Sequence, residues 1–115
     1  MRKVNIGTSE HTAVFAVDEP EFNANHDYIV SDIENDDPFV RVLFQKGPIK
    51  ENGVNGIHNE DLIAIVIDRL QSFQESEFRC RENAVAITKL EEAVMWLNKR
   101  TQDRKNRGVE GTNKV

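Results

Sequence analysis

The longest regular pattern in this sequence lies between residues 80 and 107. Its apolar residues recur at spacings of three and four, which places them on one helical face: Ile87, Leu90, Val94 and Leu97. Three arginines then continue along the helix at spacings of four and three: Arg100, Arg104 and Arg107. The pattern therefore predicts a long helix whose first part packs in a core and whose last part can hold an anion.

A second helical pattern precedes it at residues 59–73. Asn59 is a typical N-cap residue, and the acids Glu60 and Asp61 follow in the first turn, where the helix dipole favours them. Apolar residues surround most of its circumference: Leu62, Ile63, Ile65, Val66, Ile67 and Leu70. One partner helix cannot bury so much surface, so we expect a sheet or another chain on the other side. Residues 59–107 are thus predicted to form an antiparallel helical hairpin, ended by Gly108.

The first half of the chain predicts strands. Residues 1–45 contain β-rich segments separated by turn sequences: Thr12–Val17, Asp27–Ser31 and Phe39–Phe44. The polar turn at residues 32–38 favours an antiparallel hairpin of the last two, with Arg41 facing solvent. The fold class is therefore α+β: a small N-terminal antiparallel sheet of two to four strands, followed by the long helical hairpin.

The segment between sheet and hairpin, residues 46–58, is rich in glycine. Gly47, Gly53 and Gly56, together with Pro48, predict a shaped loop rather than a regular element, which is either a connector or part of a site. Residues 108–115 are predicted to be a short mobile tail. With 115 residues in all, the chain is expected to form a single domain, residues 1–115.

Composition and charge narrow the function. At 38% hydrophobic residues the core is modest, which favours oligomerisation, and no apolar run is long enough to span a membrane. The N-terminus lacks the apolar region of a secretory signal, and the single Cys80 suits a reducing cytoplasm. Residues 1–37 carry nine acids against two cations, whereas residues 98–115 carry six cations against two acids. A basic end on an acidic protein favours a local pocket for a small anion over DNA or RNA binding.

Catalytic patterns are missing from the sequence. It has no nucleophile elbow, phosphate-binding glycine–lysine loop or zinc-protease motif, and its three histidines lack metal-ligand spacing: His11, His26 and His58. Cys80 has arginines beside it but no paired base, so a structural or exposed thiol is favoured over a nucleophile. We therefore expect neither an enzyme nor a cofactor.

Binding chemistry is better represented. Arg100 and Arg104, one turn apart, can present two guanidinium forks to phosphates, although cations also suit an ordinary helix C-terminus. Phe73 can stack on a base or close the hairpin, and Asn83 can bind a polar edge or cap a neighbouring group.

Taken together, these segments resemble a known family. FQKGPIKENGVNG, LIAIVIDRLQSF and RENAVAITKLEEAVMWLNKRTQDRKNRGVEGT resemble the helical-hairpin family shared by phage Thoeris anti-defence protein one and anti-CBASS protein two, over about residues 27–112. The β-rich start is similar to the Thoeris form. The resemblance implies a phage-encoded protein that acts in the bacterial cytoplasm and sequesters a cyclic nucleotide immune signal without cleaving it. The implied ligand is glycocyclic ADP-ribose, made by TIR-domain enzymes; the alternative is a cyclic di- or trinucleotide of CBASS defence.

The resemblance also implies site residues. Phe73 and Arg100 would sandwich a base, and Asn83 and Arg104 would contact phosphates and ribose. Some family members also hold a cyclic di- or trinucleotide in a second pocket; the resemblance does not assign its residues, and the candidates in this chain are Gln45, Lys46, Lys50 and Arg107. Asn83 and Arg100 are separated by 17 residues of one helix, or roughly 25 Å, which exceeds a cyclic nucleotide. The site must therefore be shared between chains of a homo-oligomer, either a dimer or a hexamer.

Overall fold

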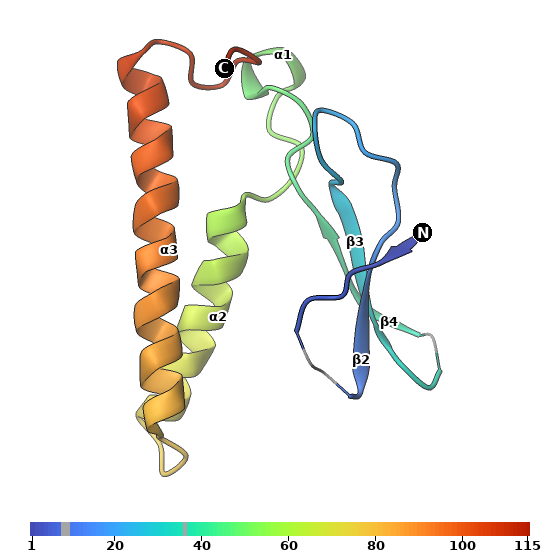
Figure 1. Ribbon diagram of the computed structural model, residues 1–115, viewed down its shortest axis with the longest axis vertical. Coiled ribbons are helices and arrows are strands. Elements are labelled where there is room, and N and C mark those ends of the chain that lie inside the picture. Colours follow the sequence, from blue (N-terminus) through green and yellow to red (C-terminus); the bar gives the residue numbers. More distant parts are fainter. Residues whose placement is uncertain (8–9, 36) are drawn as a thin grey trace. The chain divides into compact units, whose positions relative to one another are not determined.

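A computed structural model describes residues 1–7, 10–35 and 37–115. They form two compact units, Met1–Ile57 and His58–Val115. The first unit carries an antiparallel sheet and the second a helical hairpin (Figure 1). This arrangement confirms the predicted α+β class, and the boundary between the units falls at the end of the glycine-rich loop.

The sheet has four antiparallel strands in sequence order: β1 (Arg2–Lys3), β2 (Thr12–Ala16), β3 (Asp27–Asp32) and β4 (Pro38–Leu43). The three predicted strands are confirmed to within one residue at most ends, including the β3–β4 hairpin, while β1 was not predicted. The predicted turn between β3 and β4 includes Asp36, which lies outside the described residues.

Small side chains fill the centre of this sheet. Ala13 and Ala16 of β2 and Ser31 of β3 are buried, and Phe15 lies opposite Ile29 across the strands. Arg41 faces solvent, as expected, and its Nη2 lies 2.6 Å from Oδ2 of Asp27 on the neighbouring strand. The hydrogen bond from Arg41 holds the pKa of Asp27 below its ordinary value.

The glycine-rich loop is closed by a parallel bridge between Phe44 and Ile57. Contrary to the prediction, it contains one regular element, the single-turn helix α1 (Ile49–Asn52). The Gln45 side chain organises the loop because its amide nitrogen donates to Gly53 O at 2.7 Å and its oxygen accepts from Asn55 N at 3.0 Å.

The hairpin consists of α2 (Asn59–Gln74) and α3 (Arg81–Asn106). Asn59 is the first helical residue rather than the predicted cap: His58 is the N-cap, and its backbone N–H donates to Asp61 Oδ2 at 2.9 Å. At the start of α3, Cys80 is the N-cap, and its Sγ accepts a hydrogen bond from Asn83 N at 3.4 Å. Gly108 follows α3 with a φ of +74°, the left-handed conformation that ends many helices.

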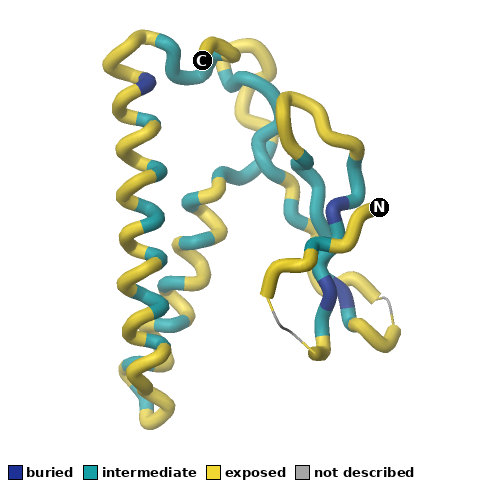
Figure 2. The backbone as a smooth tube through the Cα atoms, in the orientation of Figure 1, coloured by how far each residue is buried: buried dark blue, intermediate teal, exposed yellow. Residues whose placement is uncertain are grey.

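The two helices pack along one face each. Partly buried residues recur at helical spacing on α2 (Ile63, Ile67, Leu70) and on α3 (Ile87, Leu90, Val94, Leu97), which confirms the predicted stripe (Figure 2). Other apolar side chains of α2 remain exposed to solvent; Ile65, for example, is 63% exposed. Among the described residues, no helix is both long and apolar enough to cross a membrane.

Candidate functional site

A groove of about 680 Å³ lies on the hairpin where α2 ends. Both aromatic residues of this end line it: Phe73, which is 37% exposed, and Phe78, which is 68% exposed. Its other lining residues are Ile65, Asp68, Arg69, Ser72 and Ser76. The groove is large enough for a nucleotide-sized molecule, and it combines flat apolar rings with polar groups.

Local hydrogen bonds shape this end of the hairpin. Ser76 Oγ donates to Phe73 O at 2.6 Å and accepts from Phe78 N at 3.1 Å, which fixes the turn between the two aromatics. Gln74 holds both backbone groups of Cys80, at 3.0 Å each. Because Cys80 caps α3, these contacts place partly buried Asn83 at the same end of the hairpin as Phe73.

Arg100 lies near the other end of α3. Its side chain is exposed, and it makes no hydrogen bond or ion pair within residues 1–7, 10–35 and 37–115. Trp96, one turn earlier, is 70% exposed. The 17 residues from Asn83 to Arg100 belong to α3, which is one uninterrupted helix (Figure 1). At 1.5 Å per residue, about 25 Å separates the two along the helix axis. A single chain therefore does not bring Phe73 and Asn83 together with Arg100.

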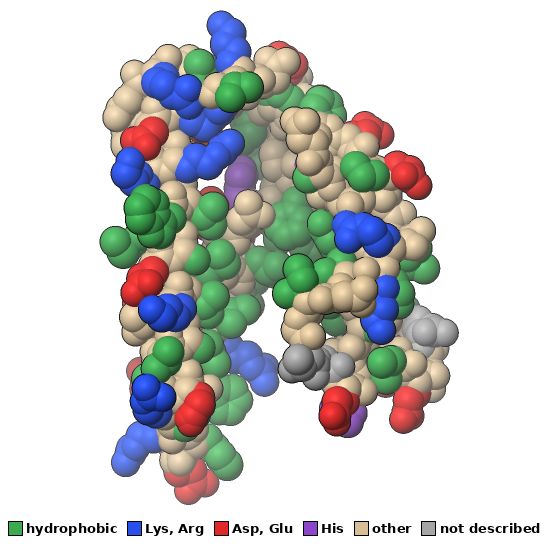
Figure 3. Space-filling model, viewed as in Figure 1, with side chains coloured by type: hydrophobic (Ala, Val, Ile, Leu, Met, Phe, Trp, Pro, Cys, Tyr) green, Lys and Arg blue, Asp and Glu red, His purple; other side chains and the backbone are tan. Residues whose placement is uncertain are grey.

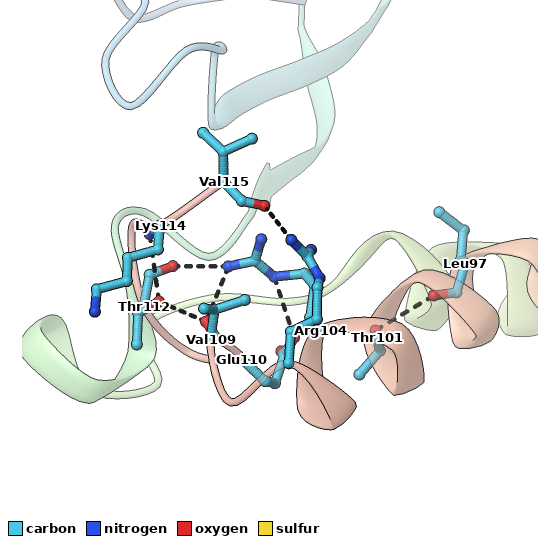
Figure 4. A network of polar contacts seen from close by, with 9 residues as sticks. Leu97, Thr101, Arg104, Val109, Glu110, Thr112, Lys114 and Val115 are labelled. Carbon is cyan, nitrogen blue, oxygen red and sulfur yellow. Dashed lines mark hydrogen bonds and ion pairs between the residues drawn. The ribbon is translucent and has the colours of Figure 1, made fainter.

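Arg104 is in a different situation from Arg100, since it is buried and engaged by the tail (Figure 4). Its Nη2 donates to Val109 O at 3.0 Å and to Thr112 O at 3.1 Å, and its Nε lies 3.4 Å from Glu110 Oε2. The segment expected to be a mobile tail is thus folded against the helix end. Of the two guanidinium groups expected to face phosphates, only that of Arg100 is exposed and unpaired in the described chain.

The residues assigned to a second nucleotide pocket are mostly engaged as well. The Gln45 amide is bound within the loop, and Lys46 Nζ lies 3.5 Å from Glu21 Oε2. Arg107 Nη1 donates to Val115 O at 2.9 Å. Lys50 is exposed on α1 and makes no ion pair or hydrogen bond with another described side chain. Of the four residues, Lys50 is therefore the one whose charged group is unengaged by the described chain.

Cations gather around the C-terminal end of α3 (Figure 3). One of them, Lys99, is neutralised by Asp103 at 2.8 Å, whereas Arg100 and Lys105 are exposed and unpaired within the described part of the chain. In that same part, no three His, Cys, Asp or Glu side chains are placed to hold a metal ion. This end can attract an anion by charge, while the groove at the far end offers aromatic surface.

Arg69 and Phe78 are among the groove residues that were not predicted from the sequence. Arg69 precedes Phe73 by four positions, and its Cζ lies 5.4 Å from the ring centroid. The spacing was a usable signal, since residues four apart on a helix are neighbours. Phe78 lies in the turn, where no periodicity marks it, and its part in the groove follows from the Ser76 contacts.

Comparison with known proteins identifies two similarities. A family model described as the Acb2/Tad1 hairpin domain matches residues 36–102, which include α2 and nearly all of α3. A protein of Bacillus phage SBSphiJ7 described as "Thoeris anti-defense 1" is 50% identical, with 90% of this chain and 91% of that protein covered. Both findings agree with the resemblance predicted from the sequence.

Proposed function

This chain belongs to the Acb2/Tad1 hairpin family, and from that premise we propose that it inhibits bacterial anti-phage defence by sequestering a cyclic nucleotide signal. The ligand of this proposal is glycocyclic ADP-ribose, made by TIR-domain Thoeris enzymes in the cytoplasm of the infected cell. The 50% identity to a protein named for Thoeris anti-defence supports that choice over other cyclic nucleotides.

The observation that carries the proposal is the pairing of chemistries at opposite ends of the hairpin. Phe73 offers an exposed ring in a groove, and Arg100 offers a guanidinium without a partner in the described chain. A base held between them gains a stacking face and a cation face. Asn83, at the Phe73 end, is available for ribose or phosphate oxygens.

Arg104 can bind a phosphate of the ligand while it keeps its hydrogen bonds to the tail. Its Nε and Nη2 serve the tail, whereas Nη1 makes no hydrogen bond to a described residue. A guanidinium has five N–H donors, so Nη1 remains able to donate to a phosphate oxygen.

The roughly 25 Å between Asn83 and Arg100 requires two chains for each site. In an antiparallel pair, the Arg100 end of one hairpin meets the Phe73 end of the other. The exposed apolar residues of α2 support such a partner: Leu62, Ile65 and Val66. Dimers of this kind, or hexamers built from them, would carry two sites per pair.

Sequestration requires affinity and no bond-breaking chemistry. A sequestering protein must bind the signal more tightly than the host receptor does, which requires a nanomolar Kd, or a binding free energy of about −12 kcal/mol. The test is calorimetry with glycocyclic ADP-ribose, followed by heating of the complex and chromatography of the supernatant. Recovery of intact signal supports sequestration, and recovery of breakdown products would refute it.

Variants test the residues of the site. Phe73→Ala and Arg100→Ala are expected to abolish binding while the oligomer measured by light scattering persists. Lys105→Ala removes another exposed cation from the same helix end and is expected to bind nearly as the parent does. Wild-type affinity in both site variants would show that the site lies elsewhere.

Mixing variants tests whether the site is shared. Asn83→Ala chains exchanged with Arg100→Ala chains form mixed pairs in which one site carries both defects and the other carries neither. Random pairing therefore restores about one quarter of the sites. A mixture without any restored binding would contradict the two-chain site.

The alternative ligand is a cyclic di- or trinucleotide of CBASS defence, bound in addition or instead. The matching family model includes the Acb2 branch, and the loop presents Lys50 as an unengaged cation. The same calorimetric panel includes these ligands, and Lys50→Ala is the variant that would weaken their binding.

A further inference from the structure

The groove at the end of α2 contains a contact that the proposed function does not use. The Arg69 guanidinium carbon lies 5.4 Å from the centroid of the Phe73 ring, within the range of a cation–π interaction. The two residues are one turn apart on the same helix, so the contact is built into α2. Among the described residues, this ring is the interaction partner of the Arg69 side chain.

An aromatic ring has two faces, and Arg69 occupies one of them. A ring held by a cation on one side also has fewer orientations to lose when a ligand stacks on the other side, which lowers the entropic cost of binding. We propose that Arg69 is a positioning residue, which fixes the Phe73 ring and leaves a single face for the base of the bound nucleotide. This inference rests on the proposed function and specifies how one of its contacts is prepared.

The other polar groups of the groove indicate which part of the ligand enters it. The Asp68 carboxylate is exposed in the groove lining and forms no ion pair or hydrogen bond with a described side chain. A carboxylate repels phosphate and accepts hydrogen bonds from ribose hydroxyls or from an exocyclic amine. The occupant of the groove is therefore an uncharged base with its sugar, and the phosphates lie outside it.

The side chains and the base are then stacked in a fixed order. Arg69 lies on one face of Phe73, and the base lies on the other face. On the two-chain site proposed above, Arg100 of a second copy covers the far side of the base. The base is then enclosed by one ring and one guanidinium, and Arg69 acts on it only through the ring.

The test is a double-mutant cycle with glycocyclic ADP-ribose as the probe. Arg69→Gln is expected to weaken binding by about twofold to fivefold, as the loss of an exposed cation–π contact implies. Arg69→Lys keeps a cation over the ring and is expected to restore most of the affinity. Arg79→Gln removes the same charge from the nearby turn and is the matched control, with little expected effect. Phe73→Leu removes the ring but keeps an apolar side chain beneath the base, so its binding is expected to be weaker than that of the parent and, unlike that of Phe73→Ala, still measurable.

The cycle separates positioning from direct contact. In the Phe73→Leu background, Arg69→Gln is expected to have no further effect, because no ring remains to be held. An equal loss in both backgrounds would mean that Arg69 binds the ligand itself, and unchanged affinity in Arg69→Gln would mean that it does nothing; either result overturns the inference. Failure of the parent protein to bind the probe would instead refute the proposed function.

Discussion

Replacing Arg104 by glutamine is expected to release the tail from the end of α3. The arginine is buried at 9% exposure and donates to Val109 O and Thr112 O at 3.0 and 3.1 Å. Glutamine is too short to reach both carbonyls and carries no charge for Glu110. The tail would then lose the contacts that Figure 4 shows converging on one guanidinium.

Two opposing effects set the magnitude of this loss. Two hydrogen bonds from a charged donor contribute roughly 3–6 kcal/mol together. Freeing the tail returns backbone entropy, at about 1–2 kcal/mol per residue that becomes disordered. It also hydrates Glu110 Oε2, which is buried without a hydrogen-bond partner in the described structure. Because these gains offset most of the lost hydrogen-bond energy, we expect a net loss of no more than about 2 kcal/mol, or a fall in Tm of up to roughly 8 °C.

Amide exchange reports on the same event locally. The Val109 and Thr112 amides donate to Arg104 O and Val109 O, at 3.0 and 3.1 Å, and are expected to be protected in the parent protein and fast in Arg104→Gln. Arg107→Gln is the control, because it removes one exposed hydrogen bond to Val115 O and leaves the Arg104 contacts intact. Protected tail amides together with an unchanged Tm in Arg104→Gln would refute the reasoning.

Two further predictions concern the sheet unit. The pKa of Asp27 is lowered chiefly by the hydrogen bond from Arg41, so the pair stabilises the fold above the ordinary carboxylate pKa of 3.8, and this contribution is lost as the pH falls through the lowered value. Circular dichroism against pH is expected to show less acid sensitivity in Asp27→Asn, and identical acid profiles would contradict the assignment. Gly56→Ala places a Cβ 2.5 Å from the Phe44 carbonyl, so we expect destabilisation of about 1–3 kcal/mol in urea unfolding. Val54→Ala changes a side chain that is 73% exposed in the same loop and serves as the control; equal midpoints for the two variants would show that the backbone adapts to the Cβ.

The regular elements were predictable because their patterns are local. Strands β2 to β4 follow from runs of β-branched and aromatic residues, and helices α2 and α3 follow from apolar spacing, whereas the single-turn helix α1 has no such pattern. Strand β1 could not be predicted, since Arg2 and Lys3 form a strand only by pairing with Ala16 and Phe15. Propensity carries no information about that pairing.

The candidate site also contains features that follow from local sequence patterns and features that do not. Helical spacing predicts which end of the hairpin carries Phe73 and which carries Arg100, so those positions were accessible from the sequence. Whether each arginine side chain is exposed or bound by the tail could not be predicted, because Arg100 and Arg104 occupy equivalent positions in the helical pattern. Their difference arises from the turn after Gly108, which brings tail carbonyls back to Arg104 and leaves Arg100 exposed. Carbonyl positions depend on backbone geometry and not on side-chain identity.

The uninterrupted course of α3 has a consequence for how such a protein can diverge. A substitution on the outer face of the helix changes one side chain, whereas an inserted residue between Asn83 and Arg100 turns one of them by about 100° relative to the other and adds about 1.5 Å. No neighbouring segment of α3 can absorb that rotation, because the helix is continuous over 26 residues. Point changes can therefore accumulate along this rod, while changes of length are tolerated where the chain turns: in the loops of the sheet unit, in the segment between α2 and α3, and after Gly108.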